Sequence, residues 1–187
     1  TEHVLDYPRD YVRQETGYWC GPASTQTVLY SRGLFVDEGE LARQIGTHTG
    51  GTNHIGLIVP VLNSRLGADV YRSVGMPNDP PTAGEADRLW RDIVSSIDAG
   101  FGVVANIVAP PSNYPRGVKG SVWPAYAGGD VYHYIAVMGY DDVERAVWIA
   151  DSGFAPFGYW MSFDQLATLI PPKGYAYAAN APAPPAP

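Results

Sequence analysis

The sequence predicts an α+β fold in which a helical half comes first and an antiparallel β-sheet half follows. Up to about residue 100, apolar residues recur at helical spacing and the segments end at glycines. From residue 102 onward, short runs rich in β-branched and aromatic residues alternate with Gly/Pro-rich loops. Helices followed by strands, without an internal repeat, are typical of a segregated α+β domain. The chain has 187 residues, of which 45% are hydrophobic, and this suffices for one domain with its own core.

The helices are expected from their apolar spacing and from the residues that start or stop them. Asp37 and Glu40 have the spacing of a capping box at the start of the second helix. Pro60 indicates that the third helix is kinked or starts later than its pattern does. Ser162 and Gln165 are expected to cap a short last helix. The helices are predicted at residues 21–32, 38–45, 55–66, 86–97 and 162–170.

The strands are expected where β-branched and aromatic residues cluster between turns. Residues 131–140 and 146–151 form a hairpin around the turn at 141–145. Residues 109–130 carry repeated Pro and Gly and are expected to be a long loop, a feature that is uncommon without a function. The strands are predicted at residues 70–74, 102–108, 131–140, 146–151 and 175–178, the last as an edge strand.

Composition excludes several classes of function. The net charge is −7 and Lys and Arg form no cluster, which argues against binding to nucleic acid or to an anionic membrane. No apolar run is long enough to span a bilayer, and the N-terminal residues have no signal-peptide pattern. A single cysteine excludes an intramolecular disulfide and a cysteine zinc cluster. His48 and His54 lack metal-ligand spacing, so no metal and no cofactor are expected.

Cys20 stands at the expected start of the first helix, in the segment Gln14-Glu15-Thr16-Gly17-Tyr18-Trp19-Cys20-Gly21-Pro22-Ala23-Ser24. Unpaired N–H groups at a helix N-terminus stabilise a thiolate. Gln14 lies a short loop upstream, where its amide can reach the sulfur and donate to a developing oxyanion. Cys20 is therefore a candidate nucleophile, although a lone cysteine is more often a small buried apolar residue.

His133 and Asp151 lie on the two strands of the predicted hairpin. If the register permits, a carboxylate beside the imidazole fixes its tautomer and directs its other nitrogen at the sulfur. Taken alone, His133 is as readily a core histidine and Asp151 a turn residue. The order Gln, Cys, His, Asp, with Cys at a helix start and His on a strand, favours a catalytic interpretation.

These residues resemble papain-like cysteine peptidases, and in particular the bacteriocin-leader-processing peptidases that cut after a double-glycine leader. The matching segments cover nearly all of residues 10–172. The resemblance implies that Cys20 is the nucleophile, His133 the base, Asp151 its orienting partner and Gln14 the oxyanion donor. The resemblance rests on Gln14, Cys20-Gly21-Pro22-Ala23-Ser24, Glu40-Leu41-Ala42, Gly50-Gly51-Thr52, Gly102-Val103-Val104-Ala105, Tyr132-His133-Tyr134-Ile135-Ala136-Val137, Gly139-Tyr140-Asp141 and Asp151.

One departure from that family is the absence of a fused membrane segment, and it directs attention to the end of the chain. Residues 179–187 form a Pro/Ala-rich tract, interpreted as a linker from a domain at 1–178 to a further domain, or as a simple tail. This arrangement resembles the N-terminal peptidase module of mycobacteriophage endolysins. On that likeness, the chain is a monomer tethered to another domain. It is made in the host cytoplasm and cuts peptidoglycan peptides at the bacterial cell wall.

Two other functions stay open. One is the same chemistry on leader or protein substrates, and the other is a degenerate papain-like domain that only binds cell-wall peptide or glycan. The aromatic side chains of Trp19, Trp123, Tyr126 and Tyr132 are expected to contact the substrate. For the aromatic residues within 109–130, a loop packed by its own side chains is an equal alternative.

Overall fold

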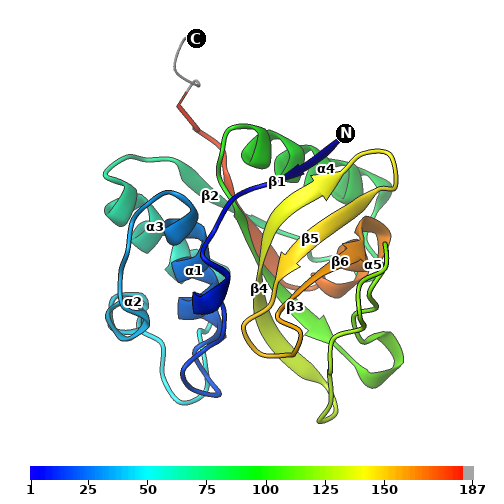
Figure 1. Cartoon of the computed structure of the whole chain (residues 1–187), viewed down its shortest axis with the longest axis horizontal. Coiled ribbons are helices and arrows are strands. Elements are labelled where there is room, and N and C mark those ends of the chain that lie inside the picture. Colours follow the sequence, from blue (N-terminus) through cyan, green and yellow to red (C-terminus); the bar gives the residue numbers. More distant parts are fainter. Residues whose placement is uncertain (183–187) are drawn as a thin grey trace.

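The protein has an α+β fold with a helical group on one side and a curved antiparallel sheet beside it (Figure 1). The computed structural model describes residues 1–182. The helical group consists of α1 (Cys20–Ser31), α2 (Glu38–Ile45) and α3 (Ile58–Leu66). This arrangement confirms the predicted fold class. The predicted linker at 179–187 lies largely outside the described residues.

The sheet has seven strands, and their order is β2-β7-β3-β4-β5-β6, with β1 paired to the far end of β4. All of its pairs are antiparallel. The strands are β1 (Glu2–Val4), β2 (Tyr71–Gly75), β3 (Val103–Ala109), β4 (Val131–Asp141), β5 (Ala146–Ala150), β6 (Gly158–Ser162) and β7 (Gly174–Ala178). The long β4 lies near the middle of the sheet, so it can carry side chains to both faces.

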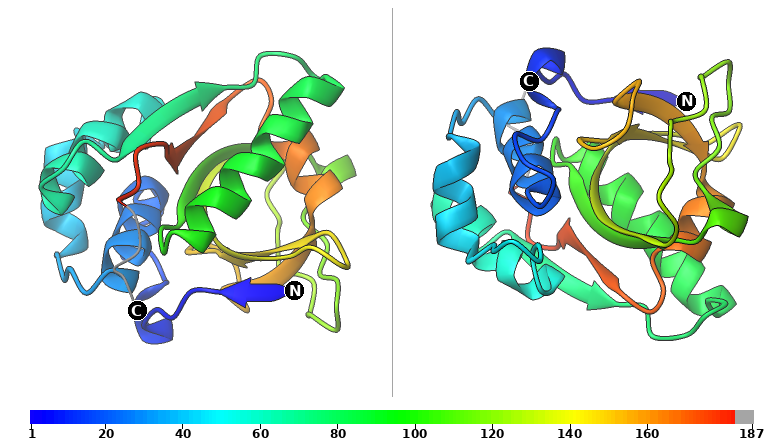
Figure 2. Two further views of the ribbon diagram at one scale, coloured as in Figure 1. Left: turned by 90° about the horizontal axis from the view of Figure 1, so that it is seen from above. Right: turned by 90° about the horizontal axis from the view of Figure 1, so that it is seen from below.

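Alternating residues of the central strands build two separate cores. Ile135 and Val137 pack with α4 (Ala83–Asp98) and α5 (Phe163–Leu169). Ala136 and Met138 point the other way and pack against the helical group. The two views in Figure 2 show α4 on the opposite side of the curved sheet from α1. Strand β4 is therefore packed between two cores, which restricts its movement.

Several predicted elements need correction. The strand at 174–178, expected at an edge, lies between β2 and β3. The short β1 and β6 were not predicted. Asp37 precedes α2 but makes no side-chain capping hydrogen bond, whereas Thr82 and Glu85 form a complete capping box on α4.

Other predicted elements agree closely with the structure. A 3-10 turn at Ile55–Leu57 precedes α3, so Pro60 falls in the first turn of the helix, where its missing N–H is harmless. Ser162 accepts a hydrogen bond from the N–H of Gln165 at the start of α5. Within residues 1–182, no helix has both the length and the apolar character needed to cross a membrane.

The long loop predicted at 109–130 is present at residues 110–130, with a 3-10 turn at Pro111–Asn113, while Ala109 is the last residue of β3. The rings of Tyr114 and Tyr126 lie 5.9 Å apart, and Tyr126 stacks on Phe154 at 3.9 Å. The loop is thus packed partly by its own aromatic side chains. This packing places the Tyr126 ring 6.1 Å from the imidazole of His133, near the start of β4.

Candidate active site

Cys20 is the first residue of α1, and its side chain is 8% exposed. The next residue, Gly21, allows the loop at Gly50–Thr52 to approach the start of the helix. A Cβ atom at Gly21 would lie 2.3 Å from Oγ1 of Thr52, which no side chain tolerates. The Gly21 position therefore sets the distance between the sulfur and the Gly-rich loop that faces it.

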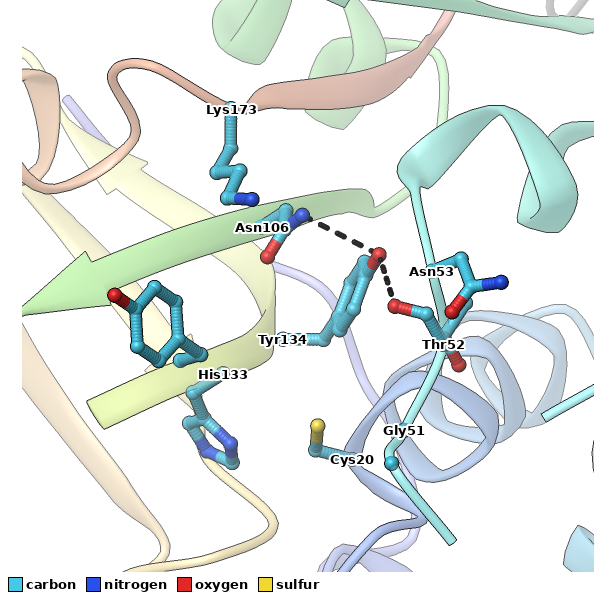
Figure 3. Close-up of a pocket in the computed structure, with 10 residues that line it drawn as sticks. Cys20, Gly51, Thr52, Asn53, Asn106, His133, Tyr134 and Lys173 are labelled. Carbon is cyan, nitrogen blue, oxygen red and sulfur yellow. Dashed lines mark hydrogen bonds between the residues drawn. The ribbon is translucent and has the colours of Figure 1, made fainter. Parts of the chain in front are cut away.

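His133 and Asp151 are brought together by the register of β4 and β5. The last pair of this ladder is Ala136 with Ala150, so Asp151 continues opposite Ile135, two residues from His133 on the same face. Nε2 of His133 lies 2.8 Å from Oδ1 of Asp151, and both side chains are buried. The other ring nitrogen is left for the sulfur of Cys20, and the two residues line the same pocket (Figure 3).

Gly153 supplies the space that the imidazole occupies. A Cβ atom at this residue would lie 2.8 Å from Cε1 of His133 and 3.2 Å from Oε1 of Gln14. The N–H of Gly153 also donates to Oδ1 of Asp151 at 3.0 Å. The Asp151-Ser152-Gly153 segment is thus both a turn and part of the site.

The second oxygen of Asp151 is held by two buried tyrosines. The hydroxyl of Tyr126 donates to Oδ2 at 2.5 Å, and that of Tyr159 donates to the same atom at 2.6 Å. With His133 and the N–H of Gly153, these bonds satisfy a carboxylate that is 0% exposed. Such bonds are what allow a charged group to persist in a buried position.

The electrostatics of the three residues favour a thiolate beside an imidazolium. Burial by itself raises the pKa of Cys20, but His133 and the backbone N–H groups of Tyr134 and Gly21 together lower it by more. Burial lowers the pKa of His133, while Asp151 and the sulfur raise it well above its ordinary value. Burial likewise raises the pKa of Asp151, and His133 with the two tyrosines lowers it below normal. Each group thus stabilises the charged form of its neighbour.

Gln14 lies beside the imidazole, with its amide held on both sides. Its Oε1 accepts from the Ser152 hydroxyl at 2.8 Å, and its Nε2 donates to the carbonyl of Thr16 at 2.8 Å. An amide nitrogen carries two hydrogens, so one remains for another acceptor. The backbone N–H of Gln14 also binds the Ser152 carbonyl at 3.0 Å, which ties the segment before α1 to the segment after β5.

A pocket opens from the sulfur between the helical group and the sheet (Figure 3). The side chain of Tyr134 extends across the pocket, and its hydroxyl donates to the Thr52 carbonyl at 3.1 Å. Nδ2 of Asn106 donates to the same hydroxyl at 3.3 Å. Figure 3 shows Lys173 at the opposite end of the pocket from Cys20. The pocket is lined by Cys20, Gly50, Gly51, Thr52, Asn53, Asn106, Tyr132, His133, Tyr134 and Lys173.

Comparison with known proteins identifies the family. A family model described as the Peptidase_C39 like family matches residues 5–167. The chain belongs to the Peptidase_C39-like family. Membership confirms the predicted resemblance to double-glycine-processing peptidases, whereas the likeness to phage endolysins stays a prediction.

Solved structures show the same fold as this C39-like chain. A protein described as a C39-like peptidase from Bacillus anthracis has a TM-score of 0.60 and 14% identity, over 97% of this chain and 100% of that one. A double glycine motif protease from an AMS/PCAT transporter, solved with its leader peptide, has a TM-score of 0.54 and 11% identity, over 95% of each chain. At such low identity, these similarities establish the papain-like fold alone.

Curated relatives of the C39-like chain match only part of it. A segment of 57 residues is 44% identical to an uncharacterized protein of Methanothermobacter marburgensis, and covers 30% of this chain and 40% of that protein. The match therefore spans less than half of that relative's length.

The four aromatic residues expected to contact substrate lie in different surroundings. Tyr132 is 68% exposed and lines the pocket, and Trp123 is 64% exposed on the long loop. Trp19 is half-buried at the start of α1, against Gly39 of α2. Tyr126 is buried with its hydroxyl on Asp151, which places it beneath the site instead of in the pocket.

Sequence reasoning missed the groups that support or extend the C39-like site. Tyr159, Asn106 and Lys173 had no local signal, because each reaches the site only through sheet pairing or packing. Gly153 did have one: a glycine two residues after a candidate catalytic carboxylate indicates a close approach of a neighbouring group. Across residues 1–182, no cluster of three or more His, Cys, Asp or Glu side chains could hold a metal ion.

Proposed function

We propose that this protein is a cysteine endopeptidase that cleaves amide bonds through an acyl-enzyme. The observation that carries the proposal is the chain of hydrogen bonds from Tyr126 and Tyr159 through Asp151 to His133, whose imidazole lines the same pocket as the thiol of Cys20 (Figure 3). A buried carboxylate that is fully hydrogen-bonded, with an imidazole between it and a thiol, is the arrangement that nucleophilic catalysis requires. A purely structural cysteine needs none of these partners.

The first half-reaction transfers the acyl group to sulfur. The thiolate of Cys20 attacks the carbonyl carbon, and the carbonyl electrons move to oxygen. When the tetrahedral intermediate collapses, the C–N bond breaks and the imidazolium of His133 gives its proton to the leaving amine. Asp151 accepts a hydrogen bond from Nε2 throughout, which keeps the other nitrogen directed at the reacting atoms.

The second half-reaction returns the enzyme to its starting state. Neutral His133 removes a proton from water as the water attacks the thioester, and the C–S bond breaks to release the acid. The backbone N–H of Cys20 and the free Nε2 hydrogen of Gln14 are the proposed donors to the oxyanion. Loss of one such donor typically costs about 3 kcal/mol of transition-state stabilisation.

The proposed substrate is the peptide part of peptidoglycan, with cleavage at the bacterial cell wall. Support comes from the pocket beside Cys20: apart from Cys20 and His133, it is lined by glycines, hydrogen-bonding residues and one lysine, and its lining includes no aliphatic side chain. The alternative is a leader peptide, and it is favoured by one structural neighbour, the double glycine motif protease solved with its leader. Both substrates require the same chemistry at Cys20.

The test compares the reduced protein with Cys20→Ala on three substrates: purified peptidoglycan, a peptide with a double-glycine leader, and an unrelated unfolded protein. Mass spectrometry of the products identifies the bond that is cut. We expect the wild type to release wall peptides and Cys20→Ala to release none. Cleavage of the leader peptide alone would replace the wall substrate with the alternative. Activity retained by Cys20→Ala would refute the thiol mechanism, and wall binding without any cleavage would indicate a binding domain.

A further inference from the structure

The protein has two lysines, and only one of them is neutralised. Lys119 forms ion pairs with Glu2 and Asp141. Lys173 makes no ion pair within the described residues 1–182, yet it lines the pocket that begins at Cys20. The catalytic steps proposed above do not use it. A positive charge without a partner, inside the substrate pocket of a chain with a net charge of −7, therefore needs an explanation.

The backbone of Lys173 is fixed on both sides, so its side chain starts from a defined position at the pocket. Its N–H donates to the Ile170 carbonyl at 2.7 Å, and its carbonyl accepts from the N–H of Met76 at 2.8 Å. The residue is half-buried, and Nζ lies 5.9 Å from the centre of the Tyr132 ring. In Figure 3 its side chain extends into the pocket beside Asn106.

The groups around the lysine are neutral hydrogen-bonding groups. Asn106 is only 7% exposed and uses Nδ2 to donate to the Tyr134 hydroxyl. Its second Nδ2 hydrogen is not needed for that bond. One ammonium beside one amide donor matches a single carboxylate, whose two oxygens can accept from both. The positive charge of His133, which also lines the pocket, is paired with Asp151 and the thiol, so within residues 1–182 Lys173 is the only unpaired cation of the pocket lining and suits a monoanion better than a dianionic phosphate.

We infer that Lys173 is a specificity-determining residue that binds a substrate carboxylate close to the scissile amide, with Asn106 as its neutral partner. The inference deepens the proposed peptidase function and rests on it. The pocket encloses about 200 Å³, enough for one amino-acid side chain or one chain terminus. The carboxylate comes from an acidic side chain or from a free terminal carboxyl group, and both have the same charge and shape.

The experiment uses matched peptides that differ only in one Glu or Gln, placed in turn at each position on either side of the cleaved bond. A third set carries a free or an amidated terminal carboxyl group at the same distances. The enzymes are the wild type, Lys173→Met, Lys173→Glu and the control Arg91→Met. Arg91 is an exposed cation on α4 outside the pocket, so the control changes the net charge equally.

We expect the wild type to prefer the acid over its amide at one position by roughly tenfold or more in kcat/KM, as for a hydrogen bond to a charged group. Lys173→Met should abolish that preference, so that it cleaves the acid peptide and its amide with equal kcat/KM. Lys173→Glu should reverse the preference for the acid peptide, and Arg91→Met should retain that preference. The set of peptides that shows the effect identifies the carboxylate as a side chain or a terminus.

Equal acid preference in the wild type and Lys173→Met would overturn the inference while leaving the peptidase intact. If no peptide is cleaved, the proposed function fails. The role of Lys173 is then tested by peptide binding. Affinities of the same peptides for Cys20→Ala and for Cys20→Ala with Lys173→Met are compared by calorimetry. An acid preference that depends on Lys173 supports the inference, and its absence refutes it.

Discussion

Tyr126 and Tyr159 donate their hydroxyl hydrogens to the same oxygen of Asp151, at 2.5 Å and 2.6 Å. One comes from the long loop and the other from β6, so the carboxylate joins two segments that are otherwise remote. The loop at 110–130 therefore supports the site by holding Asp151 through Tyr126. Its folding is coupled to that of the sheet.

Tyr159→Phe removes one of these bonds and leaves the ring in place. Because hydrogen bonds to charged acceptors contribute about 1.5–3 kcal/mol, we expect the free energy of unfolding to fall by that amount. The bond lowers the pKa of Asp151, so its loss should raise that pKa. Urea denaturation measures the change in the free energy of unfolding. The control is Tyr177→Phe, which removes only a long contact to Arg88 on the surface and should change stability by less than about 0.5 kcal/mol.

Asp151→Asn should slow turnover by roughly 10²–10⁴-fold, because the imidazole loses its orienting charge while the nucleophile remains. Cys20→Ala should be more severe. Asp151 raises the pKa of His133, so the variant should also lose its imidazolium at a lower pH, and the alkaline limb of the pH–rate profile should move toward acid. An unchanged profile, or a rate equal to that of the wild type, would contradict the role proposed for Asp151.

Alkylation of Cys20 by iodoacetamide should proceed well below the pKa of about 8.5 of a free thiol. Burial opposes ionisation, but His133 and the backbone N–H groups of Tyr134 and Gly21 together lower the pKa of the thiol by more, so the thiolate persists as the pH falls. In His133→Ala, the reaction should require a higher pH than in the wild type, since the imidazolium no longer offsets burial. Rates measured from pH 4 to pH 10 provide the comparison, and identical profiles for the two proteins would exclude the ion pair.

Gly21→Ala should reduce activity strongly, because its Cβ would lie 2.3 Å from Oγ1 of Thr52 and force the Gly-rich loop away from the helix. The matched control is Gly39→Ala in α2, whose Cβ would meet the Trp19 ring at an ordinary 3.5 Å. Replacing a helical glycine by alanine there should stabilise the fold by about 0.5–1 kcal/mol. Thermal unfolding and peptide cleavage separate the two effects. Full activity in Gly21→Ala would show that the loop position is not critical.

Glu38→Gln should stabilise the protein at alkaline pH. Glu38 is 2% exposed, and burial raises its pKa to about 8, while its Oε1 accepts from the N–H of Glu15 at 3.1 Å. A folded-state pKa above the unfolded value means that stability is complete below about pH 4.5 and is lost as the pH rises through 8. Glutamine keeps the acceptor without the charge. The Tm difference between variant and wild type should therefore grow from pH 5 to pH 9, and a constant difference would refute the assignment.

Much of the fold was predictable because its signals are local. Glycines at 33, 46 and 67 end helices, and their positive φ angles are the reason they do so. The position of β7 was not predictable in the same way. A five-residue strand at the end of the sequence gives no indication that it lies between β2 and β3, since sheet order depends on packing between distant segments.

The residues of the candidate site likewise fall into two groups, those with a local signal in the sequence and those placed by contacts between distant segments. Cys20, His133 and Asp151 could be proposed because a helix start, a strand and a strand end are each visible in the sequence. The groups that hold Asp151 and those that extend the pocket depend on the register of β4 with β5 and on the path of the long loop. Lys173 in particular has ordinary surroundings in sequence, and only its position beside Asn106 distinguishes it.

The sulfur belongs to the core formed with α1, whereas the imidazole projects from the face of β4 that packs with α4. A nascent or partly unfolded chain consequently carries an ordinary, weakly nucleophilic thiol. The proposed activity therefore requires that both halves have docked, since only then do the thiol and the imidazole line one pocket.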